Sequence, residues 1–307
     1  MDLSLVVPCF NEAENVENFY NCVADTFRDK GFSWECVFVD DGSRDGTLAK
    51  LKSLPGRVQV VSFSRNFGKE AAMYAGLCHA KGERVCVIDA DLQQHPSVVL
   101  EMMEILDQEP ETDCVAAYQQ KRKESPLLRA LKAGFYKTIN HISQVDFRPG
   151  ASDFRLMRRA MINAVLQMTE YHRFSKGIFS WVGFNTRYIP YQVRAREKGK
   201  SKWSLWGLFR YAMEGIVAFS TAPLKIATVT GFASSLAAII YMIVVVIQKL
   251  TTGISVPGYP TIVVLILLLG GLILFCLGIM GEYLARMYIQ VKNRPVFIEK
   301  EHFEKES

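Results

Sequence analysis

Two aspartates one residue apart end an apolar run in the stretch VCVIDADLQQHP, residues 85–96. In an extended segment alternate residues point the same way, so Asp89 and Asp91 face one side and Ala90 faces the other. Carboxylates this close repel each other unless a cation lies between or beside them. Oxygen ligands suit Mg²⁺ or Mn²⁺, which keep several waters and take further ligands from substrate phosphates. The pair therefore favours a site for a metal-bound nucleotide diphosphate.

The sequence contains neither a GxxxxGK[ST] phosphate loop nor a GxGxxG fingerprint. These glycine-rich loops hold the phosphates of nucleoside triphosphates and of dinucleotides. Their absence from the sequence argues against an NTPase and against a dinucleotide-dependent enzyme.

The first 117 residues alternate short apolar runs with segments of helical periodicity. Strands are expected at 3–8, 34–39, 58–63, 85–88 and 113–117, and helices at 11–27, 47–54, 69–80 and 97–106. Asn11 and Glu14 are spaced like a capping box for the first of these helices. Such alternation predicts an α/β fold with a mostly parallel sheet and helices on both faces.

Polar clusters follow four of the expected strands, and ligands of such sheets bind outside the carboxyl ends of the strands. The clusters are Pro8 to Glu12, Asp40 and Asp41, Ser64 to Lys69, and Asp89 to Gln93. Taken singly, each cluster has a plain structural alternative: a helix cap, a turn or the end of a loop. Their coincidence at one sheet edge favours a single crevice.

The chain is 50% hydrophobic yet 22% charged, with a mean hydropathy of +0.10, which indicates two unlike regions. Ile226 to Ile247 and Ile262 to Gly281 carry no charge, and a helix of about 20 residues spans the bilayer. A buried helical hairpin of a soluble core is the alternative. Basic residues precede the first run and follow the second, so both chain ends are expected in the cytoplasm, with a short external loop.

The opening MDLSLVVP lacks a basic n-region and a cleavage site, so we expect no signal peptide. The seven cysteines form no CxxC pair and are expected to be reduced core residues. The net charge of +5 gathers near the apolar runs and forms no nucleic-acid-binding stripe.

Seven motifs occur in order: VVPCFNE, DDGSRDGT, SRNFGKEAAMYAG, DADLQ, SDFRLM, KGIFSWVGF and GKSKWS, followed by the two apolar runs. This set resembles the family 2 glycosyltransferases of the dolichyl-phosphate mannose synthase type. Within them it is most similar to the bacterial enzymes that load glucose or a related sugar onto undecaprenyl phosphate. The resemblance covers nearly the whole chain and implies a GT-A fold, a UDP-sugar donor, Mg²⁺ or Mn²⁺, an inverting transfer and a homotetramer.

Carried over by position, the resemblance assigns the donor site. Pro8, Phe10, Glu12 and Asp41 would hold the uridine, with Asp40 beside it, and Asp89, Asp91 and Gln93 would hold the metal and the diphosphate. A metal that neutralises the β-phosphate makes UDP a better leaving group, which gives Asp91 a catalytic role.

Asp153 in SDFRLM matches the proposed catalytic base of the family. A phosphate monoester is largely dianionic at neutral pH, because its second pKa is about 6, so it hardly needs a base. We therefore expect Asp153 to orient the acceptor or to complete the metal site. An N-cap of the following helix is the alternative.

The acceptor phosphate requires cations near the membrane, and the candidates are Arg122, Arg129, Arg196, Ser201 and Lys202. Some of these are equally explained as solvated charges or lipid-headgroup contacts. The chain departs from the family pattern at Gln119, where an arginine is usual, and at Gln94 and His95. Lys121 or Arg122 is expected to replace the arginine. Gln94 and His95 receive no role, since a hard oxygen site has little use for imidazole.

The sequence thus predicts a GT-A domain over 1–202, an amphipathic interfacial helix over 203–225, two transmembrane helices within 226–285 (226–247 and 262–281), and a cytoplasmic juxtamembrane segment over 286–307. The expected activity is transfer of glucose or an N-acetylhexosamine from a UDP-sugar to undecaprenyl phosphate at the bacterial inner membrane. A non-catalytic sugar-nucleotide-binding scaffold, or an enzyme of the same type with another donor, remains open. A processive polysaccharide synthase is disfavoured, because the QxxRW motif is lacking.

Overall fold

The computed structural model of the chain describes residues 1–119, 140, 148, 150–192, 216–252 and 258–305. The chain forms two compact units. The first comprises Met1–Gly215 together with Arg294–Ser307, and the second comprises Ile216–Asn293. The predicted interfacial helix at 203–225 lies mostly outside the described residues, and α9 of the second unit begins at Ala222.

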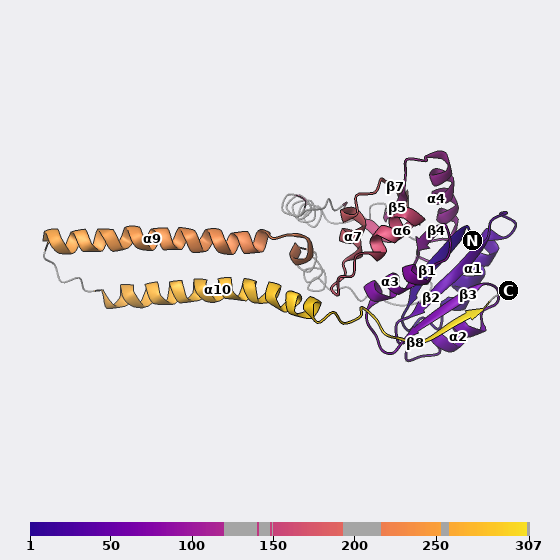
Figure 1. Cartoon of the computed structure of the whole chain (residues 1–307), viewed down its shortest axis with the longest axis horizontal. Helices are drawn as coiled ribbons and strands as arrows, with labels where there is room; N and C mark the ends of the chain where they lie inside the picture. The colour runs from indigo at the N-terminus through magenta and orange to yellow at the C-terminus, as the bar shows by residue number, and fades with distance from the viewer. Residues whose placement is uncertain (120–139, 141–147, 149, 193–215, 253–257, 306–307) are drawn as a thin grey trace. The chain divides into compact units, whose positions relative to one another are not determined.

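An eight-stranded sheet organises the first unit (Figure 1), in the order β7-β5-β6-β4-β1-β2-β3-β8. The strands are β1 (Leu3–Cys9), β2 (Trp34–Asp40), β3 (Val58–Phe63), β4 (Arg84–Val87), β5 (Cys114–Gln119), β6 (Ala151–Arg158), β7 (Thr186–Tyr191) and β8 (Glu299–Lys305). Strands β3, β2, β1 and β4 run parallel, as β5 and β7 do to each other, whereas β6 and β8 pair antiparallel to their neighbours. The predicted mostly parallel α/β fold is confirmed.

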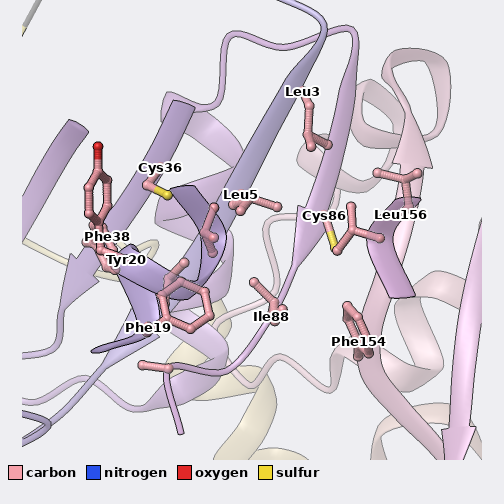
Figure 2. Packing of buried hydrophobic residues seen from close by; sticks show 14 of the residues in the cluster. Leu3, Leu5, Phe19, Tyr20, Cys36, Phe38, Cys86, Ile88, Phe154 and Leu156 are labelled. Atoms are coloured by element: carbon pink, nitrogen blue, oxygen red, sulfur yellow. The ribbon is translucent and has the colours of Figure 1, made fainter. Parts of the chain in front are cut away.

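Helices cover both faces of this sheet. They are α1 (Val16–Phe27), α2 (Thr47–Ser53), α3 (Lys69–His79), α4 (Ser97–Gln108), α6 (Arg159–Leu166) and α7 (Ser175–Trp181). Buried residues of α1, α2 and α4 share one core cluster with the alternate residues Leu3, Leu5 and Val7 of β1. Figure 2 shows Phe19 of α1 within this cluster, where its ring meets Phe38 of β2 edge to face at 6.1 Å.

Helix α3 packs on the opposite face, and its small side chains carry that contact. Ala71, Ala72 and Ala75 form a second buried cluster with Val61 and Phe63 of β3. Small residues bring the helix close to the sheet. Because α3 starts soon after β3 ends, its first residue lies near the carboxyl ends of the strands. All seven cysteines are free, and Cys9, Cys36, Cys86 and Cys114 are buried as expected, whereas Cys22 and Cys276 are only half-buried and Cys78 is exposed.

Strand β8 joins the far end of the chain to the catalytic sheet, beside β3 (Figure 1). Lys52 pairs with Glu301 at 2.5 Å, and the ring of Phe297, just before the strand, stacks on Phe63 at 5.0 Å. The stretch EKEHFEK carries charge at most positions, which suits an edge strand and gives little strand signal. The juxtamembrane assignment for 286–307 did not foresee this strand.

The second unit contains two long apolar helices, α9 (Ala222–Thr252) and α10 (Tyr259–Val291). They lie side by side (Figure 1), and the Tyr283 hydroxyl donates to the Ser220 carbonyl oxygen at 2.7 Å. Ala222–Gln248 and Thr261–Val291 are long and apolar enough to cross a membrane, and they enclose both predicted spans. Their apolar side chains are exposed, whereas a hairpin in a soluble core would bury them.

Candidate active site

The loops that follow β1 and β2 are hydrogen-bonded to each other. The amide of Asn11 donates to the Ser43 hydroxyl at 2.9 Å, and the Asn11 side-chain oxygen accepts from the amide of Arg44 at 2.9 Å. The predicted capping box is therefore wrong. Asn11 adopts a left-handed conformation with φ of 55°, and α1 begins only at Val16. The physical reason is that the Asn11 side chain caps the backbone of the neighbouring loop instead of its own helix.

Asp40 and Asp41 are both buried and act as loop anchors. One oxygen of Asp40 accepts from the amide of Ser43 at 3.1 Å, and the other accepts from the Ser62 hydroxyl at 2.8 Å. Asp41 accepts from the amides of Phe67 at 2.6 Å and Gly68 at 2.9 Å. Burial raises the pKa of Asp41, although these amide donors oppose the shift. The two aspartates thus fix the loops that follow β2 and β3.

Two glycines are required for this arrangement. Gly42 has a φ of +67°, and a Cβ there would lie 2.5 Å from the backbone of Arg65. Gly68, with a φ of +99°, precedes the first residue of α3. Both positions allow backbone conformations that side chains rarely adopt, so the loops after β2 and β3 meet closely.

The remaining residues predicted to bind uridine lie beside these loops. Pro8 lies in β1 and is paired with Val39 of β2, whereas the Phe10 side chain is 44% exposed just beyond the end of the strand. The carboxylate of Glu12 accepts from the side-chain amide of Asn15 at 2.6 Å. Phe10 therefore offers an open aromatic face next to the anchored loops.

An acidic centre forms between β4 and β6. The antiparallel register pairs Val87 with Arg155, and continuing it by two residues places Asp89 opposite Asp153. The ammonium of Lys69 lies 2.6 Å from Asp89 Oδ1 and 3.5 Å from Asp153 Oδ2. A cation between two facing carboxylates relieves their repulsion. Sequence reasoning placed Lys69 in the crevice but gave it no role.

Gln94 supports Asp89 from a buried position. Its Oε1 accepts from the amide of Asp89 at 3.1 Å, and its Nε2 lies 3.4 Å from Asp89 Oδ2. Asp91 Oδ1 accepts from the amide of Gln93 at 3.1 Å, and Leu92 has a φ of 55°, so the chain turns back sharply here. This turn folds Gln94 under Asp89, and it explains a residue to which the sequence gave no role.

His95 begins α4. Its Nδ1 accepts from the amide of Ser97 at 3.2 Å, and its Nε2 lies 3.5 Å from the Cys22 sulfur. Both ring nitrogens thus have a neighbour within hydrogen-bond distance.

The pKa values of the Asp153 and Glu70 carboxyl groups are shifted in opposite directions. Burial would raise the pKa of Asp153, but the positive charges of Lys69, Lys176 and Arg155 outweigh it and lower that pKa. Burial, and then the charge of Asp153, raise the pKa of Glu70 to about 7. Glu70 accepts from the amide of Ser175 at 2.8 Å and from its hydroxyl. Sequence reasoning missed Glu70 and Ser175, because each lies inside a helical segment without a distinctive neighbour.

The alternative that Asp153 caps a helix is excluded, since Asp153 lies in β6 and α6 begins at Arg159. Its Oδ1 is buried and has no hydrogen-bond partner. Such an orphaned carboxylate oxygen next to Lys69 is available to a ligand.

The side chains after β4 can be compared with the ligands that a divalent cation needs. Within the described residues, no three His, Cys, Asp or Glu side chains converge on one point, so no complete protein cage exists there. Asp89, Asp91 and the Gln93 amide, all partly exposed just after β4, offer oxygen ligands only. Magnesium-type sites commonly use one or two carboxylates plus substrate phosphates, so the residues present fit Mg²⁺ or Mn²⁺.

The predicted acceptor-phosphate residues Arg122, Arg129, Arg196, Ser201 and Lys202 all lie outside the described residues. Gln119 ends β5, where it pairs with Tyr191 and donates its amide to the Gly150 carbonyl at 3.2 Å.

Comparison with known proteins agrees with this architecture. The profile described as "Glycosyl transferase family 2" matches residues 4–166, and that described as "GtrB C-terminal hairpin" matches residues 222–287. The first defines the class of the catalytic unit, and the chain is an enzyme that belongs to glycosyltransferase family 2, with a GT-A sheet.

Particular relatives align over almost the whole chain. The putative glycosyltransferase CsbB of Bacillus subtilis is 43% identical over 97% of this chain and 91% of its own length. The SfII prophage-derived bactoprenol glucosyl transferase of Shigella flexneri is 40% identical over 98% of both chains. Glucosyl-3-phosphoglycerate synthase from Mycobacterium tuberculosis, solved with Mn²⁺ and UDP, superposes with a TM-score of 0.47. It is 19% identical over 70% of this chain and 77% of that one, a likeness too distant to carry a functional conclusion.

Proposed function

We propose that the chain transfers a hexose, glucose or an N-acetylhexosamine, from a UDP-sugar to undecaprenyl phosphate, with inversion and with Mg²⁺ or Mn²⁺. The observation that carries this proposal is the acidic centre just beyond the carboxyl end of β4, where the ammonium of Lys69 lies between Asp89 and Asp153. It lies in a family 2 glycosyltransferase unit on a chain that also carries a membrane-capable hairpin. Relatives named bactoprenol glucosyl transferase support glucose and a polyprenyl phosphate acceptor.

The donor half of the crevice binds and orients the nucleotide. Phe10 and Pro8 flank the base, while the loops anchored by Asp40 and Asp41 enclose it. Asp89, Asp91 and Gln93 would hold the divalent cation, whose positive charge, when it is bound, would neutralise the diphosphate and make UDP a better leaving group. The residues of the turn at Leu92 therefore define where the sugar-phosphate bond lies.

The acceptor half presents the phosphate to the anomeric carbon. A phosphate oxygen attacks from the face opposite UDP, the new carbon–oxygen bond forms as the bond to UDP breaks, and the configuration inverts. Since the acceptor is largely dianionic at neutral pH, no proton has to be removed from it. Asp153, whose lowered pKa keeps it ionised, orients the acceptor by way of the neighbouring cations Lys69 and Lys176.

Chain connectivity supports the proposed topology. The hairpin of α9 and α10 begins after the catalytic unit, and the chain then returns to that unit as β8. Two spans that start and finish at one sheet require both hairpin ends on the same side of the membrane. Lys225, Arg286 and Lys292 flank the apolar stretches, which favours the cytoplasmic side. We therefore propose a multi-pass protein of the bacterial inner membrane with both termini inside, and assembly as a homotetramer stays a prediction.

The test is transfer of radiolabelled sugar from a panel of UDP-sugars to undecaprenyl phosphate by the purified full chain with Mn²⁺ or Mg²⁺. Asp91→Asn is expected to abolish transfer, and chelation of the metal is expected to do the same. The matched control is Asp107→Asn, because Asp107 is exposed and pairs with Arg84 at the start of β4, away from the site.

Full activity in Asp91→Asn, or in the presence of chelator, would contradict the metal assignment. Binding of UDP-sugar without transfer to any polyprenyl phosphate would favour the scaffold alternative.

A further inference from the structure

Lys69 is positioned by the loop that Asp41 anchors. Asp41 holds the amides of Phe67 and Gly68, the two residues directly before Lys69. Gly68 has its φ at +99°, so the chain turns at that point and α3 begins with Lys69. The placement of the ammonium in the acidic centre therefore follows from the loop, and the long flexible stem of the lysine leaves the ammonium free to move.

The ammonium contacts both halves of the proposed site. Its side chain is 44% exposed, while those of Asp89 and Asp153 are 30% and 20% exposed. A lysine ammonium is charged at neutral pH, and the two carboxylates beside it stabilise that charge. Lys69 is thus a permanent cation, reachable by a ligand, between a donor carboxylate and an acceptor carboxylate.

A divalent cation on Asp89 and this ammonium compete for the same carboxylate. Lys69 lies 2.6 Å from Asp89 Oδ1, which is within the distance of a direct ion pair. A metal ion bound to that oxygen places two further positive charges beside the ammonium, and like charges at such distances repel strongly. We therefore expect a metal ion bound to Asp89 Oδ1 to displace Lys69 from that oxygen.

The nucleotide diphosphate supplies the new partner. In the proposed site its negative charge would lie next to Asp89 and the metal. The four-carbon side chain of Lys69 is long enough for its ammonium to reach that charge. A lysine ammonium is a compact charge with three donors and is a common ligand of phosphate oxygens.

We propose that Lys69 is a positioning residue for the donor: it spans Asp89 and Asp153 in the free protein, yields Asp89 to the divalent cation, and then pairs with the donor diphosphate. The identity of the donor rests on the proposed function. Because Lys69 opposes the metal alone and favours the metal with nucleotide, it couples the two binding events, and such coupling is reciprocal.

The experiment measures Mn²⁺ binding to the purified full chain by electron paramagnetic resonance, without and with UDP, and UDP binding at saturating Mn²⁺ by calorimetry. Lys69→Met is expected to bind Mn²⁺ alone about 1.5- to 5-fold more tightly, the range expected for loss of one partly exposed competing ion pair. The same variant is expected to bind UDP with Mn²⁺ at least about 10-fold more weakly, as when a charge-assisted phosphate contact is lost.

Two further variants separate the proposed role from a structural one. Lys69→Arg keeps the cation and is expected to restore most of both affinities, whereas Lys69→Gln is expected to behave like Lys69→Met. Lys52→Met removes an ion pair with Glu301 on β8 and is expected to leave both affinities unchanged. General unfolding would weaken the binding of both Mn²⁺ and UDP. Opposite changes in these two affinities are therefore the signature of the proposed role.

Unchanged Mn²⁺ affinity in Lys69→Met, unchanged UDP affinity, or a loss of both affinities would overturn the proposal for Lys69. These results leave the proposed function intact if the wild-type protein transfers sugar. Conversely, a wild-type protein that binds no UDP in the presence of Mn²⁺ would overturn the proposed function and this role of Lys69 together.

Discussion

Replacing Gln94 by alanine tests whether the turn after β4 supports Asp89. Gln94 is 6% exposed, and its Oε1 accepts the amide of Asp89 at 3.1 Å. Removing that partner leaves a partly buried amide unpaired, which costs about 1–3 kcal/mol. We therefore expect Gln94→Ala to lower the free energy of unfolding of the catalytic unit by about 2 kcal/mol. For a domain of about 200 residues this corresponds to a fall in Tm of about 4–8 °C.

The same substitution frees the Asp89 carboxylate. Gln94 Nε2 lies 3.4 Å from Asp89 Oδ2, and the other oxygen faces Lys69, so alanine removes one of two restraints on the orientation of the group. Loss of a residue that orients a metal ligand typically weakens metal binding by about 10- to 100-fold. Gln94→Ala should therefore weaken Mn²⁺ binding, the opposite of the effect expected for Lys69→Met.

Thermal unfolding and Mn²⁺ titration by electron paramagnetic resonance measure both effects in one preparation. Gln108→Ala is the matched control, because Gln108 is exposed near the end of α4 and donates to Glu104 within its own helix. A Gln94→Ala protein with wild-type Tm and wild-type Mn²⁺ affinity would refute the support assigned to Gln94. A fall in Tm alone would limit Gln94 to a structural role.

The remaining predictions concern pH and the last strand. Burial and the charge of Asp153 raise the pKa of Glu70 from 4.5 to about 7 in the folded protein. The folded protein therefore binds this proton more tightly than the unfolded chain does. The free energy of unfolding should then fall as pH rises from about 4.5 to 7, by at most about 3 kcal/mol. Glu70→Gln should lack this slope in thermal scans from pH 5 to 8, and parallel pH profiles for the two proteins would contradict the assignment. Phe297→Ala removes the ring stacked on Phe63 and should cost about 2 kcal/mol, with faster proteolysis after residue 290. Ile298→Ala, at a position 52% exposed, is its control, and equal cleavage rates would show that the stacking does not hold β8.

The parallel half of the sheet was predictable because its signals are local. Residues 3–8 are apolar and β-branched and end at Pro8, and the strand β1 covers Leu3–Cys9. The helix expected at 69–80 appears as α3 over Lys69–His79. Each such element depends on the periodicity of its own residues, and the carboxyl ends of parallel strands must meet at one edge. The gathering of polar loops at the carboxyl ends of these strands follows from these two rules.

The partners inside the crevice were not predictable in the same way. Asp89 faces Asp153 because β6 inserts antiparallel beside β4, a pairing between segments about 60 residues apart that leaves no local pattern. Resemblance supplied Asp153 but not its neighbour. The support from Gln94 depends on the left-handed turn at Leu92, a conformation that leucine rarely adopts and that no sequence rule anticipates.

Asp41 links the two halves of the site, and its two roles are compatible. Its oxygens accept from the amides of Phe67 and Gly68, while an ionised carboxylate has about four acceptor positions. A position therefore remains for a donor on a bound base, as the resemblance to the family requires of this residue. The same carboxylate also fixes the backbone before Lys69. A base that donates a hydrogen bond to Asp41 would therefore affect the position of the ammonium between Asp89 and Asp153. If the chain has the proposed function, nucleotide binding and the placement of Lys69 would be coupled through this one buried side chain.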